Sequence, residues 1–304
     1  MFDPRYIEQV HLLLSCMPAV SEQKCFALKG GSAINLFVHD MPRASVDIDL
    51  TYLPLFPRDE ALAGIESALL CIKSKLEIDL NGVTVREKRI QGHLAKLIVI
   101  TSSAEIKIEP NLILRGVLGK PVVRELCSAA QTAFQDYCRV PVVSDADLYA
   151  GKICAALDRQ HPRDLFDIKI LMEDSGITPD IRRAFVVYLA GHNRPIHELL
   201  NPNLNDIKDL FERQFAGMTH EPTTIAELID VRQNLVANLV LSLDSAERQF
   251  LLSIKSGDPD WNILGFTNLK SMPALKWKLK NIRKMDRQKR IEQLETLQIL
   301  LDQN

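Results

Sequence analysis

Two aspartates separated by one residue are the side chains of this sequence best suited to chemistry. Asp47 and Asp49, called the acid pair below, lie in a run from Ser45 to Tyr52 in which apolar and polar residues alternate. This period of two predicts a β-strand, in which residues i and i+2 share one face. Two carboxylates so close repel each other unless a cation lies between them. The spacing therefore predicts a metal site, and hard oxygen ligands with room for water and phosphate suit Mg²⁺.

A glycine pair and a serine come shortly before the acid pair. Gly30, Gly31 and Ser32 are followed by an apolar stretch, residues 33–38, that predicts a helix. The backbone N–H groups of such a turn and the positive end of the helix dipole suit a phosphate. A phosphate site facing a metal-binding acid pair predicts transfer of a phosphoryl or nucleotidyl group.

A third carboxylate, Glu109, ends a strand predicted over residues 104–109, where apolar residues again alternate with charged ones. Glu109 is either a further metal ligand or part of an ordinary solvent-exposed face. The alternation is compatible with both interpretations.

A second cluster of charged residues follows in the C-terminal half. Lys152 and Arg159 are seven residues apart, so they share one face of a predicted helix. Arg163, Asp164 and Asp167 then fall in the first turns of the next helix, which a proline opens. The cations are suited to holding a triphosphate. The alternative is a structural corner between two helices, in which these charges form salt bridges.

Length and composition favour a two-domain globular protein. The chain has 304 residues, and near residue 140 the alternating pattern gives way to helical periodicity. We expect one domain over 1–140, which begins with a helix over 4–17 that Pro18 ends, and a mainly helical one over 141–304. The helices expected in the second domain include 204–215, 223–254 and 274–301. The six scattered cysteines, without a C-x-x-C pair, are typical of reduced thiols in the cytoplasm. Neither a membrane span nor a signal peptide is expected.

A basic run lies near the C-terminus. Residues 270–290 include nine lysines and arginines and one acid, with Trp277 among them. Such a run can follow a phosphate backbone while the aromatic ring stacks on a base. The alternative is the solvated face of an amphipathic helix, predicted over 274–301. The net charge of −2 excludes general coating of nucleic acid but allows a local basic patch.

These motifs resemble the AbiEii/AbiGii toxin family, which includes the MenT-type toxins, within the polymerase-beta-type nucleotidyltransferase superfamily. The resemblance rests on G-G-S, followed about fifteen residues later by D-x-D, and on the pattern K-x6-R-x3-R-D-x2-D from Lys152 to Asp167. It covers roughly residues 24–175. It implies an α/β (α+β) fold, with a mixed sheet in the nucleotidyltransferase lobe and a helical lobe that completes the active site.

The resemblance also assigns roles to residues of this chain. It implies that Asp47, Asp49 and Glu109 hold Mg²⁺, with a two-metal site possible, although many relatives carry aspartate at the third position. Ser45 lies where similar toxins carry a serine that an antitoxin kinase modifies, and it is otherwise a turn residue before the strand. The remaining residues that the resemblance makes catalytic or nucleotide-binding are Gly31, Ser32, Lys152 and Asp167. Arg159 and Arg163 are added to the nucleotide-binding residues because of their charge and spacing.

The activity implied is that of a magnesium-dependent nucleotidyltransferase, the toxin of a toxin–antitoxin pair. Its substrates would be a nucleoside triphosphate and an RNA, with the 3′ end of tRNA as the expected acceptor, and its partner a cognate antitoxin. One alternative is a nucleotidyltransferase that modifies a small molecule such as an aminoglycoside. The other is a non-catalytic module that binds RNA or a partner, although a silent site has no reason to keep two repelling carboxylates.

Overall fold

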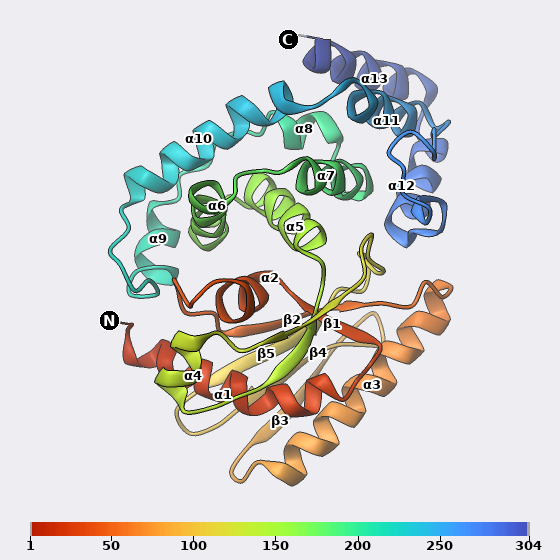
Figure 1. The fold of residues 1–304 in the computed structure, drawn as a ribbon. Coiled ribbons are helices and arrows are strands. Elements are labelled where there is room, and N and C mark those ends of the chain that lie inside the picture. Colours follow the sequence, from red (N-terminus) through yellow and green to blue (C-terminus); the bar gives the residue numbers. More distant parts are fainter. Residues whose placement is uncertain (1, 303–304) are drawn as a thin grey trace. The chain divides into compact units, whose positions relative to one another are not determined.

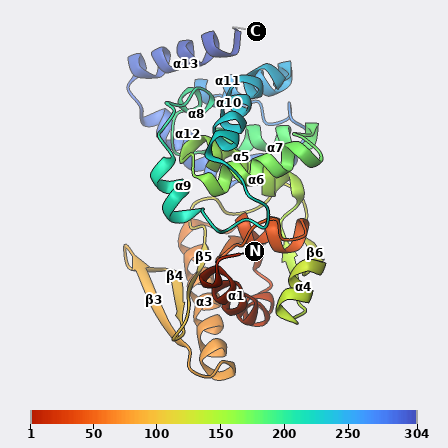
Figure 2. The same ribbon diagram turned by 90° about the vertical axis from the view of Figure 1, so that its left-hand side faces the viewer.

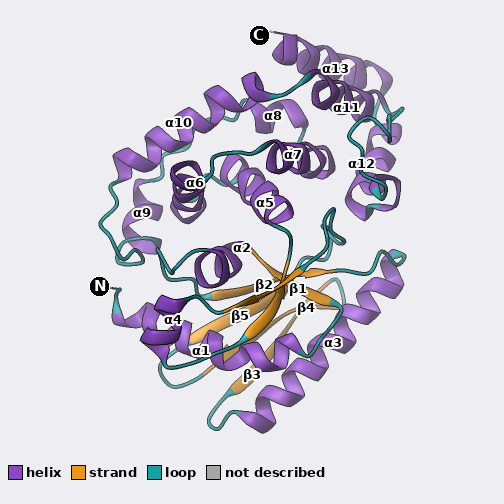
Figure 3. Ribbon diagram, viewed as in Figure 1, coloured by secondary structure: helices purple, strands orange, loops and turns teal. Residues whose placement is uncertain are grey.

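The computed structural model describes residues 2–302, which form two compact units. The first unit comprises the described residues up to 144 together with the segment 215–222. The second comprises residues 145–214 and the described residues from 223 onward. The strands lie in the first unit and helices make up the second (Figure 1, Figure 3). The predicted fold class, a mixed α/β lobe with a mainly helical C-terminal lobe, is confirmed.

A mixed sheet organises the first unit. Its seven described strands follow the order β3-β4-β5-β2-β1-β7-β6, and Figure 2 shows β3 and β6 on opposite sides of this unit. The pairs β2–β5 and β1–β7 are parallel, and the other neighbours are antiparallel. The strands are β1 (Phe26–Lys29), β2 (Asp47–Tyr52), β3 (Thr84–Ile90), β4 (His93–Ile100), β5 (Glu105–Pro110), β6 (Val122–Glu125) and β7 (Arg139–Val142).

Helices cover both faces of this sheet. On one face, α1 contacts β5 and β7 while α3 contacts β3 and β4, and on the other α2 lies over β2 (Figure 1). The face toward α1 and α3 is apolar because alternate strand residues, such as Ile48, Leu50 and Ile108, have 0% exposure. The helices are α1 (Pro4–Ser21), α2 (Gly30–Ala33), which a π-helical turn (Ile34–Val38) extends, α3 (Arg58–Asp79) and α4 (Ser128–Phe134).

The segment 215–222 returns to the first unit from a distant part of the sequence. It pairs with the stretch that leads into β2: Arg43 and Thr219 form an antiparallel bridge. The backbone N–H of Ala44 also donates to the carbonyl oxygen of Met218 at 2.7 Å. The residues just before the acid pair are thus held by backbone that lies far downstream.

The second unit is a helical assembly. In it, α5 packs against α6 and α7, α10 contacts α6, and α11 contacts α7, α12 and α13. Its elements are α5 (Asp145–Asp158), α6 (Pro162–Asp174), α7 (Pro179–Gly191), α8 (Ile196–Leu200), α9 (Lys208–Gln214), α10 (Ile225–Ser242), α11 (Ser245–Ser256), a 3₁₀ turn (Leu269–Ser271), α12 (Pro273–Lys284) and α13 (Arg287–Asp302). Across residues 2–302, no helix combines the length and the apolar character needed to span a bilayer.

Helix α1 continues through Pro18, where the sequence predicts its end. A proline inside a helix removes one hydrogen bond and strains the preceding turn. The extra turn nevertheless persists, because Ala19 and Val20 are only 3% and 5% exposed and so keep their apolar surface from water. The prediction that Pro18 terminates this helix is therefore wrong.

The segment 223–254, predicted as a single helix, forms most of two helices, α10 and α11. Asp244 is the N-cap of α11 and accepts a hydrogen bond from the backbone N–H of Glu247 at 2.9 Å. In turn, the carboxylate of Glu247 accepts a hydrogen bond from the backbone N–H of Asp244 at 2.9 Å. This reciprocal capping box starts a new helix inside an uninterrupted apolar pattern.

Other boundaries also differ from those expected. The helix predicted over 274–301 is divided into α12 and α13, and the one predicted over 204–215 is the shorter α9. Residues 122–142 form β6, α4 and β7, which the sequence pattern does not predict. These elements have four, seven and four residues, too short for a clear period.

We predict that Asp244→Ala lowers the free energy of unfolding by about 1 kcal/mol or somewhat more, because the substitution removes an N-cap. Asp244 also accepts a hydrogen bond from Arg182 at 3.3 Å, which adds to the loss. Denaturant unfolding measures the difference. Asp258→Ala, which removes an exposed carboxylate after the same helix, serves as the control and should change little. Equal effects of both substitutions would contradict the capping role.

Candidate functional site

The acid pair lies on β2, in the middle of the sheet. Asp47 and Asp49 are half-buried, whereas the intervening Ile48 is completely buried. The two carboxylates therefore extend from the sheet face opposite the apolar one. On a strand their Cα atoms are about 6.6 Å apart, close enough for strong repulsion in a partly dry environment.

Glu109 lies on the strand next to the acid pair, and its charge is matched by a lysine. The parallel pairing of β2 with β5 sets Asp49 opposite Glu109. Glu109 Oε2 accepts a hydrogen bond from Lys96 Nζ, on β4, at 2.7 Å. Among the described residues, no group of three or more His, Cys, Asp or Glu side chains is arranged to hold a metal ion. This face thus offers the acid pair as two close ligands, with Glu109 engaged by Lys96.

Gly30 makes room for the carboxylate of Asp49. It follows β1 directly and has a φ of +70°, a left-handed conformation that glycine adopts without strain. A Cβ atom at this position would lie 2.4 Å from Asp49 Oδ2. Hence the Asp49 carboxylate packs against the backbone of the glycine turn, and any side chain at residue 30 would displace it.

Ser32 ties the glycine turn to β2. Its side chain is fully buried, and Ser32 Oγ donates to the main-chain carbonyl of Asp47. Ser32 Oγ also lies 3.0 Å from Ser45 Oγ. A hydroxyl has one proton, so Ser45 is the donor in the contact between the two serines. Ser32 therefore holds the backbone of the acid pair in place, and Ser45, only 6% exposed, supports it.

Arg43 is a buried residue of this region that belongs to none of the sequence motifs. It is 2% exposed, and its Nη1 donates to the carbonyl oxygen of Ala44 at 2.8 Å. A Cβ atom at Gly31 would lie 2.6 Å from Arg43 Nη2 and 2.9 Å from Ser45 Oγ. Gly31 is therefore needed for the close approach of a buried guanidinium group. No spacing in the sequence could have indicated this, because Arg43 stands alone in an irregular stretch.

In the second unit, Lys152 is buried between two carboxylates. Its Nζ lies 2.8 Å from Asp164 Oδ1 and 2.8 Å from Asp167 Oδ2. The three side chains are at most 5% exposed. One cation and two anions in a dry environment stabilise each other, and the removal of one member would leave charge uncompensated. The corner between α5 and α6 is built around this cluster.

Arg159 completes the charge balance of the corner. Its Nη2 donates to Asp164 Oδ1 at 2.9 Å, and its Nε pairs with Asp164 Oδ2. Burial alone would raise the pKa of Asp164, but the charge of Lys152 and the hydrogen bonds from Arg159 hold that pKa well below its ordinary value. The side chain of Arg159 is 62% exposed, so its guanidinium group reaches the surface with its orientation fixed from beneath.

Arg163 occupies the first turn of α6. The N-cap of this helix is His161, whose Nδ1 accepts from the backbone N–H of Arg163 at 3.1 Å. Burial lowers the pKa of His161, which leaves Nδ1 available as an acceptor near neutral pH. The side chain of Arg163 is half-buried.

The residues predicted to act in catalysis or binding thus fall into two groups. Within the first unit, β2, the neighbouring end of β5 and the short helix α2 bring together Gly31, Ser32, Asp47, Asp49 and Glu109. Within the second unit, the corner between α5 and α6 brings together Lys152, Arg159, Arg163 and Asp167.

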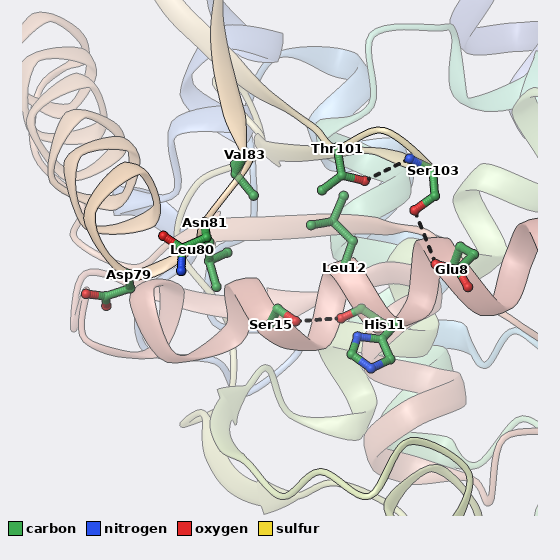
Figure 4. Close-up of a pocket in the computed structure, with 10 residues that line it drawn as sticks. All are labelled: Glu8, His11, Leu12, Ser15, Asp79, Leu80, Asn81, Val83, Thr101 and Ser103. Carbon is green, nitrogen blue, oxygen red and sulfur yellow. Dashed lines mark hydrogen bonds between the residues drawn. The ribbon is translucent and has the colours of Figure 1, made fainter.

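A hollow of about 260 Å³ lies elsewhere in the first unit (Figure 4). It is formed by one side of α1, the end of α3 and the turn between β4 and β5, where Ser103 Oγ donates to Glu8 Oε2 at 3.2 Å. None of the residues predicted to be catalytic lines it. Within its wall, Ser15 Oγ donates to the carbonyl oxygen of His11 at 2.9 Å.

The chain matches the model of one protein family and is similar in fold to a solved structure. The model of a family described as "Nucleotidyl transferase AbiEii toxin, Type IV TA system" matches residues 11–281. Among solved structures, the chain is similar to MenT4, a nucleotidyltransferase toxin from Mycobacterium tuberculosis H37Rv, with a TM-score of 0.56 and 17% identity. That alignment covers 97% of this chain and 92% of the other. No curated protein matches the chain.

We predict that Gly30→Ala impairs Mg²⁺ binding more than it impairs the fold. The substitution costs about 1 kcal/mol for the left-handed backbone and pushes the Asp49 carboxylate aside. Gly82→Ala is the matched control, because Gly82 has a similar φ of +73° but no atoms near its Cβ position. Thermal unfolding with and without Mg²⁺ measures both effects.

Wild type and Gly82→Ala should gain stability from Mg²⁺, whereas Gly30→Ala should gain little. An equal gain in all three proteins would show that Asp49 takes no part in binding the ion.

A second prediction concerns Asp164→Asn. Because its folded-state pKa lies below the ordinary value of 3.8, Asp164 stabilises the fold above that pH, and this contribution is lost as the pH falls further. At neutral pH the variant should lose about 3–5 kcal/mol, as expected when a buried ion pair is broken. Chemical unfolding between pH 7 and 3 should show a smaller decline for the variant than for wild type.

The control for this experiment is Asp174→Asn, which changes an exposed carboxylate at the other end of α6. It should follow the wild-type pH dependence. If Asp164→Asn follows it as well, the Lys152 cluster does not stabilise the corner through its charges.

Proposed function

Because the chain belongs to the AbiEii family of nucleotidyl transferase toxins of type IV toxin–antitoxin systems, we propose that it transfers a nucleoside monophosphate from a nucleoside triphosphate to the 3′ end of an RNA. We take tRNA as the acceptor. The observation that carries the proposal is the acid pair, two half-buried carboxylates on one face of β2 that pack against a glycine turn.

In the proposed reaction the 3′ oxygen of the RNA attacks the α-phosphorus of the nucleotide. A bond forms between that oxygen and the α-phosphorus. The bond from the α-phosphorus to the oxygen that bridges it to the β-phosphorus breaks. Pyrophosphate leaves with the electron pair, and a carboxylate of the β2 face or water accepts the hydroxyl proton. This transfer is mainly a matter of positioning and charge stabilisation, which fixed side chains can supply.

The donor set of this face fits Mg²⁺. Asp47 and Asp49 supply two hard oxygen ligands, and a site with one or two carboxylates leaves positions for phosphate oxygens and water. When bound there, Mg²⁺ would offset the negative charge of the phosphates and make the attacking hydroxyl more acidic. Glu109, paired with Lys96 at 2.7 Å, would contribute from the neighbouring strand, either to a second ion or as a proton acceptor.

The other residues act mainly by positioning. Gly31 and Ser32 hold the turn against the acid pair, so that its backbone can approach a phosphate. Lys152 and Asp167 are buried together, which favours a role in shaping the corner rather than direct contact with the triphosphate. Arg159, oriented by that corner and exposed, is the cation that we assign to the phosphates. Arg163, in the next turn, supports it.

The proposed setting is the bacterial cytoplasm, with a cognate antitoxin as partner. The family description names a toxin–antitoxin system, and a toxin that acts on tRNA must work where tRNA is found. RNA is favoured over a small-molecule acceptor because the second unit carries a basic helix, α12.

The test is transfer itself. Purified protein is incubated with each α-labelled nucleoside triphosphate and total tRNA, with and without Mg²⁺. We expect label on tRNA only when Mg²⁺ is present. Asp49→Asn should reduce the rate at least about 10²-fold while the fold persists, because removal of one electrostatic group costs that much. Asp59→Asn, an exposed carboxylate on α3, is the control.

Transfer by Asp49→Asn at the wild-type rate would remove the acid pair from the mechanism. Label on an aminoglycoside and none on any RNA would replace the proposed acceptor with a small molecule.

A further inference from the structure

Helix α12 presents one face made almost entirely of cations. Lys276, Lys280, Arg283 and Lys284, called the basic face below, are all exposed. Their spacing of i, i+4, i+7 and i+8 sets them on one side of the helix, with about 5–6 Å between neighbours. α12 itself, residues 273–284, contains no acidic residue.

The opposite side of α12 packs inward and fixes the direction of the basic face. Its buried residues include Leu275, Leu279 and Ile282. Lys278 belongs to this inner side: it is 6% exposed, and its Nζ donates to two backbone carbonyl oxygens, those of His192 and Arg194, each at 2.7 Å. Burial lowers the pKa of Lys278 to about 8.

Lys278 therefore belongs to the packing of the second unit, although the sequence counts it in the basic run. The structure thus separates the run into cations that hold the helix in place and cations that face the solvent.

The basic face has no ionic partner among residues 2–302. None of its four side chains forms a salt bridge or a side-chain hydrogen bond with that part of the chain. The one acid of the run, Asp286, is used as a cap, because its Oδ1 accepts from the backbone N–H of Lys289 at 3.2 Å. Four neighbouring positive charges without a partner among the described residues repel one another, and an external polyanion would relieve that repulsion.

An aromatic side chain borders the basic face. Trp277 is next to Lys276 in sequence and is 40% exposed, so part of its ring is accessible to a ligand. A surface that combines cations with an accessible aromatic ring can bind phosphates and stack on an unpaired base. A purely acidic protein partner would use the cations but would have no base to lay on the ring.

We propose that the basic face and Trp277 bind the phosphate backbone and one unpaired base of the RNA acceptor. The inference rests on the proposed function, in that the acceptor is an RNA, and it identifies the surface that holds this RNA. With four cations facing phosphates, a plot of the logarithm of the binding constant against the logarithm of the salt concentration should have a slope of about −3.

The test measures binding alone, with a labelled tRNA transcript and no nucleoside triphosphate, so that no transfer can occur. The full chain and the variant Lys276→Gln/Lys280→Gln/Arg283→Gln/Lys284→Gln are compared across a salt series. The variant should bind at least about tenfold more weakly at low salt, with a slope flatter by about 3. Because all four residues are exposed, its thermal unfolding should match that of wild type.

Two controls distinguish the loss of the basic face from a general loss of positive charge and from a folding defect. The variant Arg86→Gln/Lys88→Gln/Lys208→Gln/Arg213→Gln also removes four exposed cations, but none from α12, and should bind as wild type does. The variant Lys276→Arg/Lys280→Arg/Lys284→Arg keeps the charge and should keep the binding.

Stacking is tested by substitution of Trp277. Trp277→Ala should weaken tRNA binding by about tenfold without a change in salt slope, whereas Trp277→Phe should retain most of the affinity. Equal affinity for the alanine and phenylalanine variants would remove the base contact from the proposal.

Wild-type affinity and salt slope in the first quadruple variant would overturn the inference. This outcome would not affect the proposed function, which the transfer assay with Asp49→Asn tests separately. Conversely, salt-dependent tRNA binding through α12 without any nucleotide transfer would support the RNA-binding surface and contradict the proposed transfer activity.

Discussion

The central position of β2 decides where charge can lie in the first unit. The strand has β1 on one side and β5 on the other, so its backbone groups are used in pairing. One of its faces carries Ile48 and Leu50 at 0% exposure, and a charge there would lose its hydration without compensation. The carboxylates of the acid pair can therefore lie only on the other face. Gly30 and Ser32 are fitted to that face, the first by leaving space and the second by holding the strand backbone.

The second unit treats its charges in two contrasting ways. At the α5–α6 corner, Lys152 has carboxylate partners on adjacent turns and is hidden from water. On α12, Lys278 is also hidden, but it is satisfied by carbonyl oxygens instead of acids. The cations of the basic face have no such partners in the described chain. Buried charge thus fixes the shape of the helices, and exposed charge is left for a partner molecule.

Sequence reasoning succeeds where one local period determines the outcome and fails where a distant segment does. The alternation around the acid pair predicts its strand, since a one-residue shift would bury both carboxylates. Pro18 is different, because the helix continues on account of tertiary burial and not of local propensity. The contact between Lys96 and Glu109 depends on which strands are neighbours, and composition does not reveal this. The inward direction of Lys278 follows from packing against another helix, so a count of charges cannot predict it.

The return of segment 215–222 to the first unit imposes an order on biosynthesis. A ribosome delivers the chain from its N-terminus, and early domains usually fold while later ones are still being made. Here the stretch before the acid pair pairs with residues that are made much later, because Arg43 pairs with Thr219 and Ala44 with Met218. Helices α5 to α9 emerge in between. A nascent chain that has released only the sheet lacks this last piece of backbone, so the acid pair acquires its final support only after most of the polypeptide has left the ribosome.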